Sequence, residues 1–393
     1  MDAIPPSPAV RRGGNGRTWP RVRFTIVFAG ASSSSRSSAL QAPPRTPRFV
    51  CGVRRHQRLI LGEVVAVYTH LSAAALTRLL RPFGLGELAS IRGVSAGSVN
   101  TIYQIRAESG HFIVRILEDR PLDDALFERD LLLRLASAQL AVPTMRADAH
   151  GARVVSLTER QHLSVFDYVS GEELSEAAVQ PQHCLQIGSF LGAMHRATDG
   201  MADTRPNPYG PQRIRATLGR CQQADWPPRQ QQHLQQLERV LCGAVWDPGL
   251  PWGVTHGDLF VDNARFAQGR LAGVIDFEMA GRSPLIHDLA VVLTAWAFVG
   301  SHWQPERARA VIAGYETQRV LRRAERLGLF AATCFAAARF TATRFHDFEL
   351  RAHRDAERLH KDYREFLSRL HAIQRLGADG LLADLWPGVP TDS

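Results

Sequence analysis

The segment HGDLFVDN, residues 256–263, holds side chains that together could transfer a phosphoryl group. Asp258 is a carboxylate that can accept the proton of an attacking hydroxyl, and His256 precedes it by two positions. Asn263 and Asp276 offer oxygen atoms of the kind that hold Mg²⁺ against phosphates. We therefore predict His256 and Asp258 as catalytic residues, and Asn263 and Asp276 as metal ligands.

Two other interpretations of this segment are open. Its polar side chains could serve only to cap loops and turns. The spacing H-x-D-x(4)-N, followed by a predicted hairpin and Asp276, favours catalysis because it is the arrangement of kinase catalytic loops. A metal hydrolase is disfavoured, since His287 and Asp288 are the nearest further ligands and adjacent residues on a helix point to different faces.

A glycine-rich stretch upstream, GVSAGSVN at residues 93–100, lies between two candidate strands. Its backbone N–H groups could cover the phosphates of a nucleotide. We predict Gly93, Gly97 and Asn100 as nucleotide-binding residues. The alternative is an ordinary turn between strands, where glycine is common.

A kinase also needs a cation on its third strand, paired with a glutamate on the next helix. The only lysine of the chain is Lys361, far from this region. Arg115, central in HFIVRILED, stands where that cation is needed, and Glu128 on the following predicted helix is its expected partner. The alternative is an outward-facing arginine on an amphipathic strand.

A further strand, Phe166–Val169, leads into Gly171. A strand in this place could offer backbone donor and acceptor groups to an adenine ring. We predict Asp167 and Val169 as contacts of this kind. A plain edge strand fits the same residues.

The rest of the chain supplies strands followed by helices. Glu108-Ser109-Gly110 and Gln268-Gly269 predict the turns of two hairpins. Apolar residues at helical spacing predict helices around the first hairpin and through most of the second half. We expect an α+β, protein-kinase-like fold with a small β-rich N-terminal lobe, residues 65–170, and a larger α-rich C-terminal lobe, residues 171–393.

Charge and composition limit the classes of molecule that this protein is expected to bind. Residues 1–64 hold eleven arginines against Asp2 and Glu63, whereas the remaining residues hold 36 basic and 36 acidic side chains. The basic leader is predicted to be disordered, and it is either a misassigned start, native disorder or a targeting segment. The balanced remainder argues against nucleic acid as a partner. The five cysteines lack C-x-x-C spacing, and no apolar run is long enough for a membrane span.

With these residues in view, the chain resembles the aminoglycoside phosphotransferase and choline kinase superfamily, and most of all the bacterial type II homoserine kinases. HGDLFVDNARF, GVIDFEMAG and HDLAV match the catalytic loop, metal strand and brace of that family, and VAVYTHLS resembles its usual start. The resemblance implies ATP and Mg²⁺ as cofactors and Asp288 as a structural brace of the catalytic loop, although an aspartate near a helix start can also be a cap.

The family's late helical pattern appears as Arg339-Phe340 and as Thr343 to Asp347. An amino-acid acceptor needs a cation for its carboxylate, so Arg339 or Arg344 is the expected partner, with surface arginines as the alternative. Asn100 to Tyr103 and Thr294 to Trp296 depart from the family's usual residues, which leaves the acceptor open.

Together these observations predict a cytoplasmic, ATP-dependent kinase of a small hydroxylated molecule, with homoserine in amino-acid (threonine) biosynthesis as the first expectation. Choline, ethanolamine or an aminosugar are alternative acceptors. A kinase-like binding protein without catalysis, or nucleic-acid binding through the leader, are alternatives of other classes. We expect a monomer or homodimer that binds neither nucleic acid nor membrane.

Overall fold

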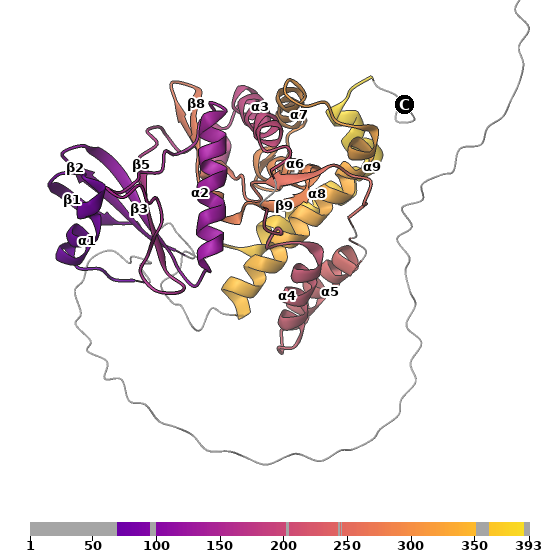
Figure 1. Ribbon diagram of the computed structural model, residues 1–393. Coiled ribbons are helices and arrows are strands. Elements are labelled where there is room, and N and C mark those ends of the chain that lie inside the picture. Colours follow the sequence, from indigo (N-terminus) through magenta and orange to yellow (C-terminus); the bar gives the residue numbers. More distant parts are fainter. Residues whose placement is uncertain are drawn as a thin grey trace, which may run out of the picture. The chain divides into compact units, whose positions relative to one another are not determined.

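The computed structural model describes residues 69–94, 100–201, 204–242, 244, 246–350 and 361–388 (Figure 1). The chain divides into two units, and all described residues belong to the second, Gln57–Ser393. The predicted leader, residues 1–64, and Gly97 lie outside the described residues. Their predicted roles stay predictions.

The first half of the described chain is built on a five-stranded antiparallel sheet with the strand order β1-β2-β3-β5-β4. Its strands are β1 (Leu88–Gly93), β2 (Thr101–Ala107), β3 (Gly110–Leu117), β4 (Val155–Ser156) and β5 (His162–Asp167). The predicted hairpin is present, because Ala107 pairs with Gly110 across the turn between β2 and β3. In the same register Arg115 of β3 stands opposite Ile102 and Ser164.

Helix α1 (Ala73–Leu80) packs its apolar side against this sheet. Ser72 caps the helix, since its hydroxyl accepts from the backbone N–H of Ala75 at 3.2 Å. Leu76 and Leu80 are buried with the sheet residues that form one apolar cluster. Burial of this face, and not the short helix itself, holds α1 in place.

Helix α2 (Leu122–Ser137) follows the sheet and lies between it and the helical part of the chain in Figure 1. Its apolar face follows from helical spacing: Phe127, Leu131 and Leu135 are buried together in the large apolar cluster of the described residues. The buried Glu128 lies on the same helix, so α2 carries both a packing face and a charged group toward the sheet.

The second half is mainly helical. Its helices are α3 (Pro181–Ala197), α4 (Pro211–Gln222), α5 (Pro228–Cys242), α6 (Leu285–Trp296), α7 (Pro305–Glu316), α8 (Arg323–Arg344), continued by a π-helical turn (Phe345–Leu350), and α9 (Tyr363–Leu385). Short antiparallel pairs join β6 (Trp252–Thr255) to β9 (Gly281–Pro284), β7 (Ala264–Ala267) to β8 (Arg270–Val274), and β10 (Phe298–Val299) to β11 (His302–Trp303). The predicted turn at Gln268-Gly269 joins β7 to β8.

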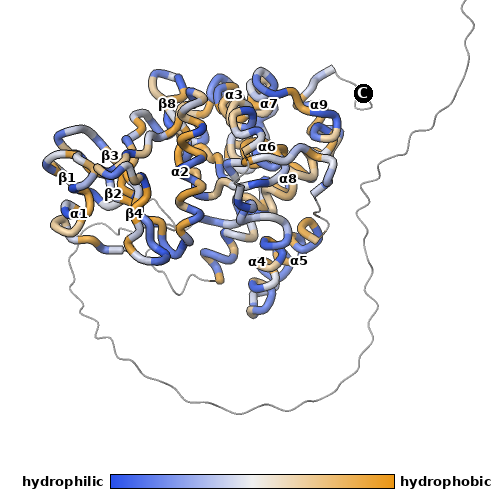
Figure 2. The backbone as a smooth tube through the Cα atoms, in the orientation of Figure 1, coloured by the Kyte–Doolittle hydropathy of each residue, from blue (hydrophilic) through white to orange (hydrophobic). Residues whose placement is uncertain are grey.

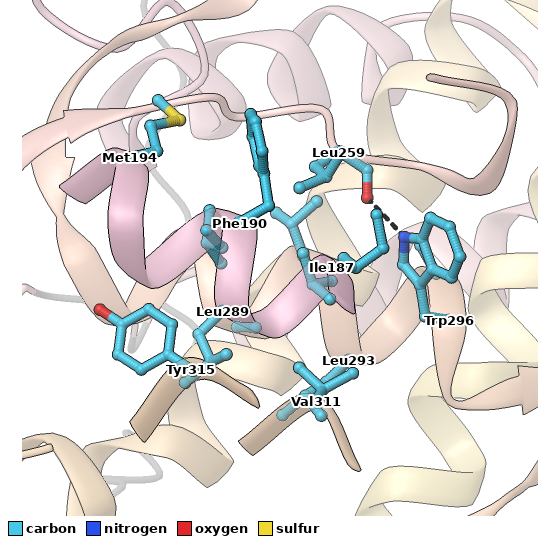
Figure 3. Close-up of a cluster of buried hydrophobic side chains, with 14 of the residues drawn as sticks. Ile187, Phe190, Met194, Leu259, Leu289, Leu293, Trp296, Val311 and Tyr315 are labelled. Carbon is cyan, nitrogen blue, oxygen red and sulfur yellow. Dashed lines mark hydrogen bonds between the residues drawn. The ribbon is translucent and has the colours of Figure 1, made fainter. Parts of the chain in front are cut away.

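Helices α3 and α7 approach each other closely because glycines line their contact. A Cβ on Gly188 would lie 2.0 Å from the backbone oxygen of Val311, and one on Gly314 would lie 2.0 Å from that of Leu185. Figure 3 shows the apolar side chains beside this contact, with the indole of Trp296 donating to the backbone oxygen of Leu259 at 3.0 Å. The segment that carries Leu259 is therefore packed directly on the core helices.

Helices α4 and α5 form a separate apolar cluster with α8 and α9. Both alternate hydrophilic and hydrophobic segments along the tube in Figure 2, as expected of helices that bury one face. No helix of the described residues is long and apolar enough to cross a membrane. The predicted α+β architecture, with a β-rich first part and an α-rich second part, is confirmed.

Candidate active site

The loop that carries His256 and Asp258 follows β6 and is held by one carboxylate of α6. Asp288 accepts hydrogen bonds from the backbone N–H groups of His256 at 2.6 Å and Gly257 at 2.8 Å. Gly257 has a φ of +77°, and a Cβ there would lie 3.0 Å from the backbone oxygen of Met279. Asp288 is the fourth residue of α6, so its carboxylate braces the loop and does not cap the helix.

His256 itself points inward. It is fully buried, its Nε2 contacts the backbone oxygen of Ile275 at 3.2 Å, and its Nδ1 lies 3.3 Å from the backbone N–H of Asp258. The ring packs against Phe277 with centroids 4.6 Å apart. In this geometry His256 positions Asp258 and ties the loop to the strand that carries Asp276.

Asp288 ends a buried chain of polar side chains. His195 contacts Asp288 through Nε2 at 3.2 Å and the Tyr315 hydroxyl through Nδ1 at 2.8 Å. Arg319 donates to that hydroxyl at 3.0 Å and forms a two-pronged ion pair with Glu325 at 2.8 and 2.9 Å. Because Arg319 donates to the Tyr315 oxygen, the hydroxyl proton is left for Nδ1 of His195, and Nε2–H then donates to Asp288.

These donors keep Asp288 ionised. Burial alone would raise the pKa of its carboxyl, but the hydrogen bonds from His195 and from the backbone N–H of Gly257 outweigh burial and lower the pKa below its ordinary value. An ionised carboxylate accepts two backbone hydrogen bonds more strongly than a neutral acid. The catalytic loop is thus fixed by a charge that does not titrate near neutral pH.

Asp258 faces a buried arginine. Its side chain is 30% exposed, and its Oδ1 lies 3.4 Å from Nη1 of Arg339 on α8, whose side chain is only 3% exposed. The guanidinium of Arg339 lies over the rings of Tyr209 at 4.1 Å and Phe340 at 3.8 Å from their centroids. Burial raises the pKa of Asp258, and the charge of Arg339 acts against this rise.

Arg339 is incompletely satisfied. Its Nε is buried and has no hydrogen-bond partner among the described residues. Burial lowers its pKa, while Asp258, Tyr209 and Asp347 act in the opposite direction. A guanidinium keeps its charge under such a shift, so the site holds a buried positive charge with unused hydrogen-bonding capacity.

A short hairpin brings Asn263 and Asp276 to the catalytic loop. Asn263 ends the 3₁₀ turn Val261–Asn263, and its Nδ2 donates to the backbone oxygen of Asp258 at 2.8 Å. The backbone N–H of Ile275, beyond β8, donates to the backbone oxygen of Asn263 at 2.9 Å. Asp276 follows with a φ of +67° and is close enough to act on the pKa of Asp258.

These two residues fit a magnesium ion. With Nδ2 of Asn263 bonded to the loop, its side-chain oxygen remains available as a ligand, and the carboxylate of Asp276 is 42% exposed. Mg²⁺ prefers such oxygen ligands. No group of three or more His, Cys, Asp or Glu side chains in the described part of the chain could hold a metal ion. An ion at this pair would therefore need further oxygen ligands from outside the protein, such as water or phosphate.

Arg115 of β3 faces the same region. It forms an ion pair with Glu128 of α2, and its Nη1 lies 3.6 Å from Oδ1 of Asp276. Its side chain is 8% exposed, so the outward-facing alternative is wrong. Burial alone would lower the pKa of Arg115, but the charges of Glu128, Asp276 and Glu278 outweigh it and raise the pKa. The cation expected on the third strand is thus beside the candidate metal ligand.

The glycine-rich loop is described only at its ends. Gly93 closes β1, and Asn100 precedes β2 with its side chain buried. Asn100 donates through Nδ2 to Glu278 and accepts through Oδ1 from the backbone N–H of Glu118 at 3.2 Å. Asn100 therefore fixes the end of the loop to the segment after Asp276.

Glu278 was not predicted from the sequence. Its carboxyl is buried, and burial together with the charge of Asp276 raises its pKa to about 8. The residue lies in the 3₁₀ turn Phe277–Met279, which follows Asp276. Its position two residues after Asp276 could have marked Glu278 as a site residue. Its contact with Asn100 could not be predicted, because the two residues lie 178 positions apart in the sequence.

The predicted adenine-binding strand is β5, which ends at Asp167. The backbone N–H of Asp167 donates to the backbone oxygen of Thr144 at 2.9 Å. The carboxylate of Asp167 forms an ion pair with Arg146 at 2.5 Å. The N–H of Tyr168 is likewise bonded within the sheet, to the oxygen of His111 at 3.0 Å. Of Asp167, Tyr168 and Val169, only Val169 has no backbone hydrogen bond within the described chain.

The two arginines expected near an acceptor differ. Arg344 pairs with Glu365 at 2.7 Å and donates to the backbone oxygen of Asp362 at 3.2 Å. It lies five residues beyond Arg339, about 140° around the helix. Arg339 contacts Asp258, and Arg344 does not. Tyr209, which stacks on Arg339, comes from the loop before α4, where no motif in the sequence marks it.

The sequence pattern of the Phosphotransferase enzyme family matches residues 90–327, and the chain belongs to this family. It is 32% identical over 325 residues to the homoserine kinase of Granulibacter bethesdensis, covering 81% of this chain and all of that one. It is 33% identical over 327 residues to the homoserine kinase of Gluconacetobacter diazotrophicus, with the same coverage. The family recognised from the sequence motifs is confirmed.

Solved structures share the fold at lower identity. An amicoumacin kinase in complex with AMP-PNP and Ca²⁺ matches 77% of this chain and 94% of its own, with a TM-score of 0.59 and 19% identity. A spectinomycin phosphotransferase in complex with ADP and spectinomycin matches 81% and 99%, with a TM-score of 0.57 and 11% identity. The chain has the kinase-like α+β two-lobe fold, as predicted.

Proposed function

We propose that this protein is a kinase that transfers the γ-phosphate of MgATP to the side-chain hydroxyl of homoserine or a closely related hydroxylated amino acid. The observation that carries the proposal is the contact between Asp258, the expected base, and the buried Arg339. A base beside a cation suits an acceptor that carries both a hydroxyl and a carboxylate. Homoserine kinases that align over their whole length support the same acceptor.

In this proposal Asp258 orients the acceptor hydroxyl and receives its proton as the oxygen attacks the γ-phosphorus. Asn263 and Asp276 would hold Mg²⁺, which neutralises the charge of the transferring phosphate. Arg115, fixed by Glu128, holds phosphate oxygens through two parallel hydrogen bonds. The rate of phosphoryl transfer is then set by positioning and charge neutralisation, and both need a rigid catalytic loop.

Arg339 is the proposed partner of the acceptor's carboxylate. Its guanidinium is fixed between Tyr209 and Phe340, and its Nε is unused within the described chain. Arg344 is committed to Glu365. A fork held by two aromatic rings loses little side-chain entropy when it binds a carboxylate. In this proposal Arg339 has two roles: its charge opposes the rise in the pKa of Asp258, and its guanidinium binds the carboxylate of the acceptor.

The test is ADP release by the full chain with MgATP and a panel of homoserine, choline, ethanolamine and an aminosugar, with the phosphorylated product identified by mass. We expect O-phosphohomoserine. Turnover of choline or the aminosugar but not of homoserine would assign a different acceptor. If ATP binds but no acceptor in the panel leads to ADP release, the protein is a kinase-like binding protein without catalysis.

The proposed site of action is the cytoplasm, with a small molecule as substrate. Beyond residue 64 the acidic and basic residues balance, which gives nucleic acid no overall attraction. Deleting residues 1–64 should leave phosphotransfer unchanged and should remove any retention on DNA.

A further inference from the structure

The turn that follows Asp276 is held by an arginine that no proposed step uses. Arg205 lies in the segment before α4, and its side chain donates to two backbone oxygens of this turn. Nε donates to the oxygen of Ala280 at 2.8 Å, and Nη2 donates to the oxygen of Glu278. The third nitrogen, Nη1, lies 2.9 Å from Oδ2 of Asp124. One guanidinium therefore joins the turn after the candidate metal ligand to the first turn of α2.

The backbone of Arg205 is itself fixed in the helical half of the chain. Its carbonyl oxygen accepts from the backbone N–H of Arg282 on β9 at 2.7 Å, and the N–H of Asn207 donates to the oxygen of Arg282 at 3.1 Å. A Cβ on Gly281 would lie 2.9 Å from Cα of Asn207, so glycine lets this segment lie directly against β9. The side chain of Arg205 therefore starts from a fixed backbone when it reaches the turn and α2.

The ion pair with α2 has a defined geometry. Asp124 is shared by Arg205, at 2.9 Å, and by Arg120, at 3.3 Å. The side chains of Arg205 and Asp124 are only 14% and 22% exposed. The guanidinium of Arg205 also lies 5.3 Å from the centroid of the Phe127 ring. This contact is thus shielded from solvent and stacked, unlike an exposed ion pair, which contributes little.

Asp276 needs such support because its own backbone is strained. With a φ of +67° it occupies the left-handed region, which residues other than glycine rarely adopt. Such a conformation persists only where the surrounding structure holds it. Before Asp276, the backbone of Ile275 is bonded to Asn263 and His256. After Asp276, the two hydrogen bonds from Arg205 hold the backbone of the turn.

The helix that Arg205 contacts also positions the cation expected to bind phosphate. Asp124 and Glu128 are four positions apart on α2 and therefore share one face of the helix. Glu128 is ion-paired with Arg115, and Arg115 lies 3.6 Å from Asp276. These contacts close a ring that runs from Arg205 through α2 and Arg115 to Asp276, and back through the turn to Arg205.

From this ring we infer that Arg205 is a positioning residue of the metal site, which sets the place of Asp276 relative to Arg115. Arg205 acts through the turn and α2 and not through a contact of its own with the nucleotide. The inference rests on the proposed function for the assignment of Asp276 as a Mg²⁺ ligand. Because Nε, Nη1 and Nη2 have separate partners, the single nitrogen of a lysine cannot replace this arginine.

The experiment measures the affinity of the full chain for AMP-PNP by calorimetry, once with Mg²⁺ and once with EDTA. The ratio of the two Kd values is the strengthening that Mg²⁺ provides. We expect Arg205→Met to weaken binding of AMP-PNP with Mg²⁺ by about 10-fold, and binding in EDTA by less than about threefold, because Arg115 keeps its pair with Glu128. Arg205→Lys should behave like Arg205→Met.

Arg134→Met is the matched control. Arg134 lies in the last turn of α2, at the opposite end from Asp124, and donates to the backbone oxygens of Ala197 and Asp199. It therefore also ties α2 to the helical half of the chain. Its variant should lower Tm and leave the Kd ratio unchanged. Far-UV circular dichroism establishes folding, and Arg205→Lys, which keeps the charge and the stem, decides the result if Arg205→Met does not fold.

A Kd ratio that stays at the wild-type value in the Arg205 variants would overturn the inference, and so would an equal loss in Arg134→Met. Restoration of the ratio by Arg205→Lys would show that a charge near Asp124 is sufficient, which rejects the bridging role. Wild type that binds AMP-PNP equally with and without Mg²⁺ would overturn the inference together with the metal assignment of Asp276. Failure of the proposed acceptor looks different, because no phosphorylated product then forms while the Kd ratio is still measured.

Discussion

Nη1 of Arg339, near the end of the long helix α8, lies 3.4 Å from Oδ1 of Asp258 on the catalytic loop. The contact joins residues 81 positions apart and sets the charge state of the base. Burial raises the pKa of Asp258 and Arg339 holds that rise down. The base must be ionised to accept a proton, so this ion pair connects the fold of α8 to the pH range of the reaction.

The first prediction concerns that pH range. Turnover needs ionised Asp258, so kcat falls on the acid side as pH drops through its pKa, which lies above the ordinary value of an aspartate. Arg339→Met removes the opposing charge, and the acid limb of the kcat profile should move to higher pH. Arg326→Met, on the same helix but paired with Glu316, should leave the limb in place. An unmoved limb in Arg339→Met would show that the two charges are not coupled.

A second prediction concerns ATP binding. Arg115→Met should raise the KM for MgATP by about 10- to 100-fold, because a charge-assisted, forked contact to phosphate is lost. The single variant also leaves the buried Glu128 unpaired, which costs about 3–5 kcal/mol of stability.

The double variant Arg115→Met with Glu128→Leu separates the two effects, because an apolar pair can replace a buried ion pair at little cost. It should recover the Tm while the KM for MgATP stays high. Arg106→Met, at an exposed arginine of the neighbouring strand β2, is the control. A normal KM in the double variant would remove Arg115 from the nucleotide site.

A third prediction concerns the polar chain behind the catalytic loop. Tyr315→Phe deprives the buried Nδ1 of His195 and a donor of Arg319 of their partner, and should lower the free energy of unfolding by about 1–3 kcal/mol. Because this chain ends at Asp288, kcat should fall as well, with an unchanged KM for MgATP.

Tyr363→Phe offers a matched control. Tyr363 of α9 is also buried and contacts Nδ1 of His233 at 3.0 Å, but no such chain leads from it to the catalytic loop. It should lower the free energy of unfolding and leave kcat as it is. If both variants lower kcat alike, the effect belongs to stability and not to positioning.

A fourth prediction follows from His287, which is buried between Trp246 and Phe335. Burial lowers its pKa from 6.5 to about 4, so the unfolded chain takes up a proton before the folded one does. Stability is therefore full above pH 6.5 and is lost as pH falls toward 4, by about 2 kcal/mol between pH 7 and pH 5 from this group.

Urea unfolding at pH 7 and pH 5 measures the effect. His287→Gln should reduce the loss between the two pH values, whatever its stability at pH 7, whereas His302→Gln, at an exposed histidine, should not. An equal loss in wild type and His287→Gln would mean that His287 does not contribute to acid sensitivity.

What the sequence could predict was local. The catalytic loop, Asn263 and Asp276 lie within 21 residues of one another, and the hairpin that joins them is specified by its turn residues. The cap of α1 and the apolar faces of α1 and α2 follow from residue type and spacing in the same way. Such features depend on neighbours along the chain, so they can be predicted without tertiary structure.

What the sequence could not predict was the approach of distant segments. Glu278 meets Asn100, and Tyr209 stacks on Arg339, only after the helices and the sheet have packed. The choice between Arg339 and Arg344 likewise depended on which helix face meets the catalytic loop. Burial also changes the chemistry, since Glu278 is an ordinary glutamate in sequence and an acid with a pKa of about 8 in the folded protein.

The most direct test of the phosphotransfer centre is turnover by Asp258→Asn, measured as ADP release and as phosphorylated acceptor at saturating MgATP. We expect a fall in kcat of about 10²- to 10⁴-fold with the KM for MgATP nearly unchanged, while Asp262→Asn on the same loop keeps its turnover. Turnover near that of wild type in Asp258→Asn would show that Asp258 is not the base, because no other carboxylate is proposed to receive the proton.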